Sequence, residues 1–424
     1  MRAAAQALMI SRRFWLSMTT AGACGAFAAA AGMVAAQPPP DADLERRIRR
    51  VIDEYGEQGL HRTGTTVDQR SGDWLFEEVT RAGAVPAREP FSLSRVDPVT
   101  ARLLVGDRRI EGLPLFDGTF TGADGVEGRL GPIDSDAEIG LIDAPPNTAA
   151  AGSLGAARRQ HRHTAIVCVT RGGRPGLCPN NADAFLHPFG PPVLQVSSED
   201  WQLLREHAER RSVVHLIAAV ARAPATSFNV TARIGGIDRT ALPPLVVMTP
   251  RSGWYSSASE RGGGIACWLE LMRTMLRVRH PRDIVFVASS GHELGHLGID
   301  AFVERRSGIV SQSVSWMHFG ANIGATSATG SGNTIQASDD NRELVLSQAL
   351  TAAGLGIGRR IPRGTVPGGE AEVVHRGGGR YVSVIGSNAL FHHPEDRGVK
   401  TVDLNAIARF TKAFAAVADA FSAS

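Results

Sequence analysis

The sequence predicts an α/β fold in which a mainly parallel central sheet is flanked by helices. Two apolar stretches, 245–248 and 284–288, have the composition of strands that are buried on both faces of a sheet. A helical pattern over 264–278 separates them, so the three segments form a β-α-β unit of a parallel sheet. The chain has 424 residues, 43% of them hydrophobic, which is enough for one large domain with a smaller inserted one.

Residues 1–36 are predicted to be an export signal. Arg12 and Arg13 form a twin-arginine pattern ahead of an apolar run rich in alanine and glycine, and small residues up to Ala36 suit a cleavage site. The run is short and poor in leucine, which favours removal over a membrane anchor. No later segment has the ~18 apolar residues that a span requires. We therefore expect a periplasmic or secreted protein, exported through the twin-arginine pathway, with no stable membrane span.

Charge and cysteine content exclude some classes of function. The formal net charge is +3, and no basic block alternates with aromatic residues, so nucleic acid is not an expected partner. After the leader, the cysteines are Cys168, Cys178 and Cys267, which lack the paired spacing of a zinc ribbon. A disulfide between Cys168 and Cys178 and a buried free thiol at Cys168 are both left open.

The mature chain is predicted to begin with two helices and then to change to strands. Apolar residues at helical spacing indicate helices over 44–55 and 67–82, the second of which ends at Gly83. Short alternating strands with Gly and Asp turns follow from Phe91 to Ile133.

A separate pattern of strands and helices fills the middle of the chain, from Glu138 to Ala223. It is typical of a small α/β or β-rich unit. Strands are expected over 139–142, 164–170, 192–196 and 213–219, and helices over 149–160 and 201–210. After the β-α-β unit come strands over 314–319 and 381–385 and helices over 341–353 and 404–421.

One stretch places titratable side chains directly after a buried strand. A serine and glycine turn ends the strand at 284–288, and His292, Glu293 and His296 follow at once. A helix that begins at or just before His292 places both histidines on one face, beside Glu293. The stretch also has the form H-E-x-x-H, in which the histidines bind zinc and the glutamate activates water. A zincin-type metalloprotease is therefore one hypothesis, although the glycines of this stretch weaken the helix.

Six stretches follow one another in an order that resembles a known family. They are HRTGTTVDQRSGDWLFEEVTRAG, IGLIDAPP, PPVLQVS, NVTARIGG, GHELGHLGIDAFV and FHHPEDR. They are similar to segments of the secreted zinc aminopeptidases, the di-zinc exopeptidases that include leucyl aminopeptidases and glutamate carboxypeptidases. The resemblance implies a three-layer, phosphorylase/hydrolase-like fold. It assigns 37–95 and 226–424 to a zinc-peptidase-like α/β domain and 96–225 to a protease-associated-like insert.

The resemblance also implies a set of site residues, which this chain matches only in part. The family uses five zinc ligands and a general base. His292-Glu293 matches its Glu-Glu pair, in which the first glutamate is the general base and the second is a zinc ligand. Glu293 therefore keeps the ligand position, and the imidazole of His292 takes the position of the general base. Glu260 matches the aspartate that bridges the two metals, and His392 matches the last histidine ligand, with Asp396 in a supporting place.

The other family ligands have no counterpart. Pro250-Arg251-Ser252 stands in place of the first His-x-Asp step, and the remaining aspartate falls near Gly320. Two zinc ions need several carboxylates to offset their mutual repulsion, so one ion or none is expected.

Two further hypotheses follow from this partial match. The first is a metallo-aminopeptidase or amidohydrolase that cleaves peptide or other amide bonds. Its catalytic residues are drawn from Glu293, His292 and Glu260, and its zinc ligands from Glu293, His392, His296 and Glu260. The second is a catalytically degenerate peptidase homologue that binds a peptide or small ligand. In this second hypothesis the Arg251 guanidinium neutralises Glu260 and Glu293, the carboxylates that lack zinc, and contacts the ligand.

Overall fold

The central sheet has four parallel strands at its middle. They are β8 (Leu245–Pro250), β9 (Ile284–Ser289), β10 (Ser315–Phe319) and β13 (Tyr381–Ile385), in the order β9-β8-β10-β13. Helix α5 (Gly262–Met275) connects β8 to β9, which confirms the predicted β-α-β unit. Beyond β13 the sheet continues with β11 (Asn333–Ala337) and β12 (Ile357–Arg360). The predicted α/β class is confirmed.

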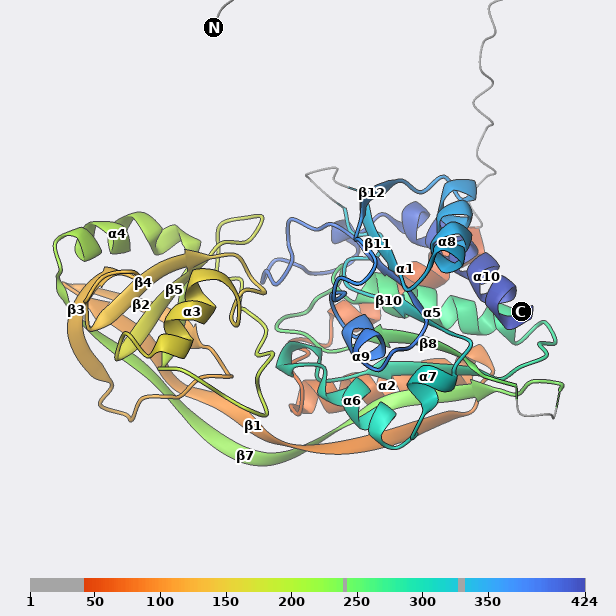
Figure 1. The fold of residues 1–424 in the computed structure, drawn as a ribbon, viewed down its shortest axis with the longest axis horizontal. Helices are drawn as coiled ribbons and strands as arrows, with labels where there is room; N and C mark the ends of the chain where they lie inside the picture. Colours follow the sequence, from red (N-terminus) through yellow and green to blue (C-terminus); the bar gives the residue numbers. More distant parts are fainter. Residues whose placement is uncertain (1–41, 239–241, 327–331, 424) are drawn as a thin grey trace, which may run out of the picture. The chain divides into compact units, whose positions relative to one another are not determined.

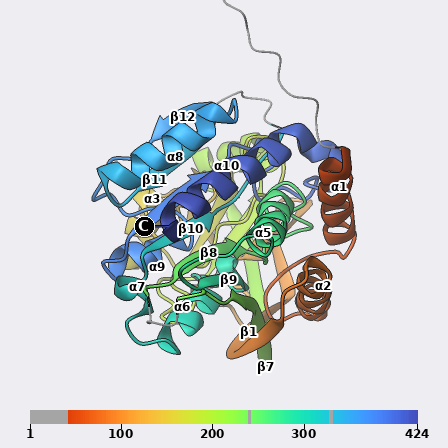
Figure 2. The ribbon, with the colours of Figure 1, turned by 90° about the vertical axis from the view of Figure 1, so that its right-hand side faces the viewer.

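Helices cover both faces of this sheet, as Figure 2 shows. Alternate residues of β8 point to opposite faces: Leu245 and Val247 pack in one apolar core, and Val246 and Met248 in another. The first core includes residues of α1 (Ala42–Gly56), α2 (Thr66–Ala82), α5, α8 (Asp340–Ala352) and α10 (Leu404–Ala423). The second includes residues of α6 (Leu297–Glu304), α7 (Ile309–Gln312) and α9 (Ala371–Arg376).

The computed structural model describes residues 42–238, 242–326 and 332–423. The predicted export signal, 1–36, lies outside the described residues. All described residues belong to one compact unit. Within these three ranges, no helix has both the length and the apolar character that crossing a membrane requires.

Two long antiparallel strands leave the central sheet together, as Figure 1 shows. β1 (Pro86–Val105) pairs with β7 (Val213–Ile234) from Pro86 opposite Ala232 to Val105 opposite Val214. The expectation of short strands from Phe91 onward is wrong at this point, because β1 has 20 residues. The ladder shifts register between Pro98 and Thr100 and then continues, so the proline does not end the strand.

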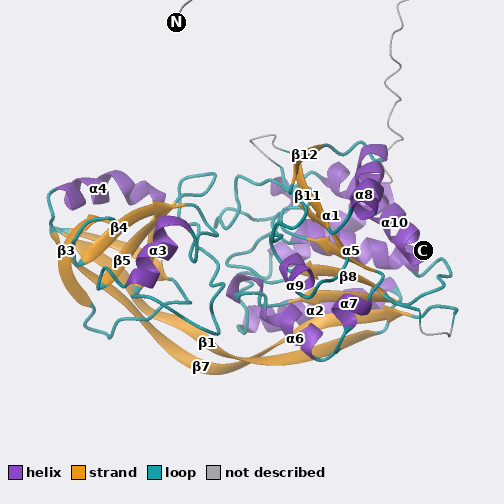
Figure 3. Ribbon diagram, in the orientation of Figure 1, coloured by secondary structure: helices purple, strands orange, loops and turns teal. Residues whose placement is uncertain are grey.

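A second group of strands lies at the other end of this pair. It has the order β2-β6-β5-β4-β3, and Figure 3 shows helices packed against it. Each face has its own apolar core, one with residues of α4 (Trp201–Glu209) and the other with residues of α3 (Gly152–Gln160). The strands are β2 (Arg108–Pro114), β3 (Val126–Pro132), β4 (Ile139–Ala144), β5 (Ala165–Thr170) and β6 (Val193–Ser197).

The assignment of 96–225 to a protease-associated-like insert, between 37–95 and 226–424, stays a prediction. Both of its expected boundaries fall inside the long strands, where Arg95 pairs with Ala223.

The structure has no disulfide between Cys168 and Cys178. Among the described residues, Cys168, Cys178 and Cys267 are all free and buried. Burial raises the pKa of the Cys168 thiol to about 12 and that of Cys178 to about 11.

Candidate functional site

The segment after β9 is not the helix that the H-E-x-x-H spacing suggests. A short 3-10 turn covers His292–Leu294, and α6 begins only at Leu297. Gly291 has φ of 89° and Gly295 has φ of 79°, values that a right-handed helix cannot contain. A Cβ atom at Gly295 would lie 2.6 Å from the carbonyl oxygen of Asp183. The predicted helix from His292 is therefore wrong, and the zincin hypothesis loses the helix face that it needs.

Glu293 is buried and held by two neighbouring loops. One carboxylate oxygen accepts the backbone N–H of Thr63 at 2.6 Å, and the other accepts the hydroxyl of Ser252 at 2.7 Å. The Ser252 hydroxyl oxygen in turn accepts the backbone N–H of Gly291 at 2.9 Å. Glu293 therefore joins the loops that follow α1, β8 and β9, with both oxygens engaged by the protein.

Glu260 and His392 are brought together, as their family positions predict. The Nε2 atom of His392 lies 3.5 Å from Oε1 of Glu260, and both side chains are buried. The Nδ1–H of His392 donates to the carbonyl of Pro179 at 2.6 Å, so in the neutral ring Nε2 has a free lone pair. Burial lowers the pKa of His392 to about 4, which keeps the ring neutral near pH 7.

The positive charge beside Glu260 comes from its neighbour in the sequence. Nη2 of Arg261 lies 2.7 Å from Oε1 of Glu260, and neither side chain is more than 1% exposed. Nε of Arg261 donates to the carbonyl of Ser252 at 2.7 Å, which fixes the guanidinium. Burial alone raises the pKa of Glu260, but Arg261 and His392 outweigh it and hold this pKa below its usual value. Sequence reasoning gave Arg261 no role in the site.

Asp396 orients the loop that carries Glu260. One oxygen accepts the backbone N–H of Ser259 at 2.8 Å and its hydroxyl at 2.6 Å, and the other accepts the backbone N–H of Glu260 at 3.0 Å. This contact agrees with the supporting place that the resemblance gives to Asp396.

Arg251 pairs with a carboxylate that the sequence gave no reason to choose. Its Nη1 lies 2.9 Å from Oδ1 of Asp68, and its Nη2 donates to the carbonyl of Phe228 at 2.6 Å. The side chain of Arg251 is fully buried. The expectation that Arg251 neutralises Glu260 or Glu293 needs correction: among the ion pairs of the described residues, its partner is Asp68, and Arg261 neutralises Glu260. A contact between Arg251 and a ligand stays a prediction.

His292 has a partner that sequence reasoning missed. Its Nδ1–H donates to Oε1 of Glu370 at 2.9 Å, and Nε2–H of His318 donates to Oε2 at 3.1 Å. Burial raises the pKa of Glu370, but His292 and His318 outweigh it and hold this pKa well below its usual range. Glu370 lies 78 residues from His292 in a glycine-rich stretch, where no spacing indicated the contact.

His296 lies beside His292 but outside any shared donor set. Their ring centroids are 5.2 Å apart. Burial lowers the pKa of His296 to about 4. Within the described residues, His296 is not grouped with two other His, Cys, Asp or Glu side chains in a way that could hold a metal ion.

These side chains do not fit the two-zinc centre that the resemblance implies. Within the described residues, no three His, Cys, Asp or Glu side chains are grouped so that they could hold a metal ion. Glu293 has both oxygens engaged by Thr63 and Ser252, and the Arg261 guanidinium already lies beside Glu260. A metal ion at Glu260 would meet a fixed positive charge in a poorly solvated site.

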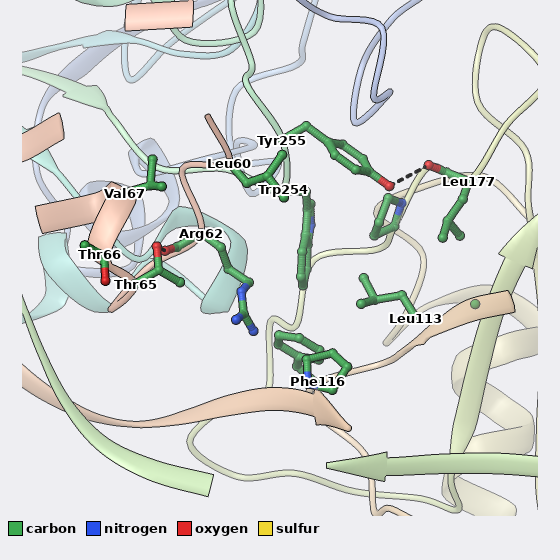
Figure 4. A pocket seen from close by; sticks show the side chains of 13 residues that line it. Leu60, Arg62, Thr65, Thr66, Val67, Leu113, Phe116, Leu177, Trp254 and Tyr255 are labelled. Atoms are coloured by element: carbon green, nitrogen blue, oxygen red, sulfur yellow. Dashed lines mark hydrogen bonds between the residues drawn. The ribbon is translucent and has the colours of Figure 1, made fainter. Parts of the chain in front are cut away.

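A cavity of about 500 Å³ adjoins the loop that follows β8. Trp254 and Tyr255 of that loop line it, together with Leu113, Phe116 and Arg62, as Figure 4 shows. The Tyr255 hydroxyl donates to the carbonyl of Leu177 at 3.1 Å. Arg62 precedes Thr63, the residue whose N–H donates to Glu293, so the cavity and the buried carboxylate share two loops.

No protein-family model and no curated protein matches this sequence. Solved structures do match its fold. A zinc aminopeptidase from Bacillus subtilis is 15% identical with a TM-score of 0.72, over 90% of this chain and 95% of that chain. A peptidase M28 precursor from Shewanella amazonensis is 16% identical with a TM-score of 0.71, over 90% and 96%. An aminopeptidase from Aneurinibacillus sp. strain AM-1 is 14% identical with a TM-score of 0.68, over 88% and 92%.

At these identities the likeness concerns the fold and not the chemistry of the site. It extends over nearly the whole length of this chain and of each matched chain. The chain therefore has the fold of the zinc aminopeptidases, as the order of its sequence elements predicts.

Proposed function

We propose that this chain is a catalytically degenerate homologue of the zinc aminopeptidases that binds a peptide or small amide ligand after export. The ion pair of Arg261 with Glu260 is the observation that carries the proposal. In the resemblance, Glu260 stands where a carboxylate bridges two zinc ions. Here the same carboxylate is neutralised by a side chain of the protein.

The Arg261 guanidinium would repel a metal ion bound at Glu260. At 4 Å and an effective dielectric constant of about 20, two unit charges repel by roughly 4 kcal/mol, and a divalent ion doubles this figure. Arg261 cannot easily move away, because its Nε donates to Ser252 and its side chain is fully buried. Displacing it would also leave a buried guanidinium without its partner.

The test is to measure zinc content and peptidase activity on the purified mature protein. After refolding with excess zinc and gel filtration, we expect less than roughly a tenth of an equivalent of zinc per chain. We also expect no hydrolysis of a panel of aminoacyl anilides above the rate of the Glu293→Ala variant. The zinc aminopeptidase from Bacillus subtilis, handled in parallel, is the positive control. Stoichiometric zinc together with hydrolysis that disappears in Glu293→Ala would overturn the proposal.

A one-metal aminopeptidase or amidohydrolase is the second candidate, and one observation favours it. Oε1 of Glu260 and Nε2 of His392 lie 3.5 Å apart; among the described residues Nε2 has no hydrogen-bond partner, and Oε1 has only its ion pair with Arg261. Of the zinc ligands that the resemblance implies, these two still have their donor atoms close together. The same zinc and anilide measurements separate the two candidates, since this one requires about one equivalent of zinc.

A further inference from the structure

The cavity beside Trp254 has rigid apolar walls. The rings of Phe116 and Trp254 meet edge to face with centroids 5.2 Å apart, and both side chains are almost fully buried. The Trp254 indole N–H donates to the side chain of Asn181 at 3.1 Å, which fixes the ring. A cavity of about 500 Å³ with such walls is large enough for one bulky side chain with its attached backbone.

A positive charge lies in the wall of this apolar space. Arg62 is the single charged residue among the 13 described residues that line the cavity, and none of them is acidic. Its guanidinium lies 5.4 Å from the centroid of the Phe116 ring. In Figure 4 the Arg62 side chain extends toward Phe116 and Trp254.

The partner of Arg62 does not neutralise it fully. Nη2 of Arg62 lies 2.6 Å from Asp97, and Arg95 lies 2.8 Å from the same carboxylate. Two guanidinium groups therefore share one carboxylate, which leaves one positive charge in excess. The Arg62 side chain is 20% exposed, and its Nη1 also donates to the carbonyl of Val96, so the remaining N–H groups of Arg62 are the ones that can donate to a ligand in the cavity.

We propose that this cavity binds an anionic ligand built like an N-acylated hydrophobic amino acid, with its side chain against Phe116 and Trp254 and its carboxylate at Arg62. The C-terminal residue of a peptide has this chemistry. The inference rests on the proposed function in one respect: the ligand is bound and not cleaved. Charge complementarity selects the carboxylate, and the apolar walls select the bulky side chain.

Calorimetric titration of the purified mature protein tests both parts of the ligand. N-acetyl-L-phenylalanine is expected to bind saturably. N-acetyl-L-phenylalaninamide lacks the charge and is expected to bind roughly fivefold more weakly, the size of a partly exposed ion pair. N-acetylglycine lacks the side chain and is expected to show no saturable binding at the same concentrations.

A pair of arginine variants locates the charge effect. In Arg62→Gln, the acid and the amide are expected to bind equally weakly. Arg88→Gln is the matched control, because Arg88 also pairs with an aspartate, Asp73, and lies over an aromatic ring, Phe76, but does not line the cavity. This control is expected to keep the wild-type preference for the acid. If Arg62→Gln does not fold, Leu113→Trp, which fills the cavity, is expected to abolish binding of both compounds.

Three results would overturn the inference: equal binding of acid and amide by the wild type, a preference that survives in Arg62→Gln, or undiminished binding in Leu113→Trp. The anilide assay is separate from these titrations. Hydrolysis of anilides with an intact preference for the acid would therefore refute the proposed function and leave the ligand assignment standing. Absence of anilide hydrolysis together with equal binding of the acid and the amide would refute the ligand assignment alone.

Discussion

Arginines neutralise two of the buried carboxylates. Arg261 lies beside Glu260, and Arg251 lies beside Asp68. The sequence indicated that Glu260 and His392 meet, because a family resemblance aligned both. It could not indicate the partner of Arg251, which lies 183 residues away in the sequence, nor the contact of Glu370 with His292. Long-range pairs of this kind leave no periodic signal, because periodicity reports only on local structure.

Loss of the guanidinium beside Glu260 should destabilise the fold. In Arg261→Met, the Glu260 carboxylate stays buried without a cation, which is expected to cost about 3 to 5 kcal/mol of unfolding free energy. Adding Glu260→Gln removes the orphaned charge and should recover part of this loss. Urea unfolding of the two single variants and the double variant measures the coupling.

A matched control for this cycle is the ion pair of Arg46 with Asp43, whose side chains are 70% and 68% exposed. Arg46→Met is expected to change stability by less than about 1 kcal/mol. The account of Arg261 fails if the double variant is no more stable than Arg261→Met alone.

Regular elements were predictable where their periodicity was uninterrupted. The strand at 381–385 appears as β13 with the same bounds, and the helix expected over 67–82 is α2, closed by Gly83 in a left-handed conformation. The failures lie where the local pattern misleads. Short strands with turns were expected from Phe91 onward, where β1 runs on for 20 residues, and the histidine spacing suggested a helix that Gly291 and Gly295 prevent. In both cases contacts with distant segments decide the conformation.

Gly295 is expected to tolerate a side chain poorly. Gly295→Ala places a Cβ 2.6 Å from the carbonyl oxygen of Asp183 at φ of 79°, so the loss of stability should be about 1 to 3 kcal/mol. Gly356→Ala is the control, since a Cβ there meets nothing within 4 Å. Thermal unfolding followed by circular dichroism compares the two. Equal melting temperatures would show that the segment relaxes freely.

At the scale of the whole molecule, the second group of strands takes part in the site. Its loops reach the central sheet through hydrogen bonds that include Tyr255 with Leu177, His392 with Pro179, and the backbone N–H of Ala182 with the carbonyl of Glu293 at 2.8 Å. These contacts place buried polar groups, including a histidine, where the two groups of strands meet. Burial of such groups makes the stability of the whole molecule depend on pH.

Acid should destabilise the protein well above the range in which carboxylates titrate. His61 is fully buried and stacks on Tyr55 with ring centroids 3.9 Å apart, and burial lowers its pKa to about 4. The unfolded chain binds this proton near the ordinary pKa of about 6.5, so unfolding takes up a proton between these two values. Stability is therefore complete above pH 6.5 and falls as pH decreases toward 4, with a loss of about 2 kcal/mol from His61 at pH 5.

The variant His61→Phe isolates this contribution, because it keeps a ring on Tyr55 and cannot be protonated. The difference in unfolding free energy between pH 7 and pH 5 should be smaller in His61→Phe than in the wild type by about 2 kcal/mol. His161→Gln, at an exposed position, should keep the wild-type difference. His296 and His392 have the same lowered pKa of about 4, so part of the acid effect should persist in His61→Phe. A wild-type protein as stable at pH 5 as at pH 7 would contradict the burial of these rings as neutral groups.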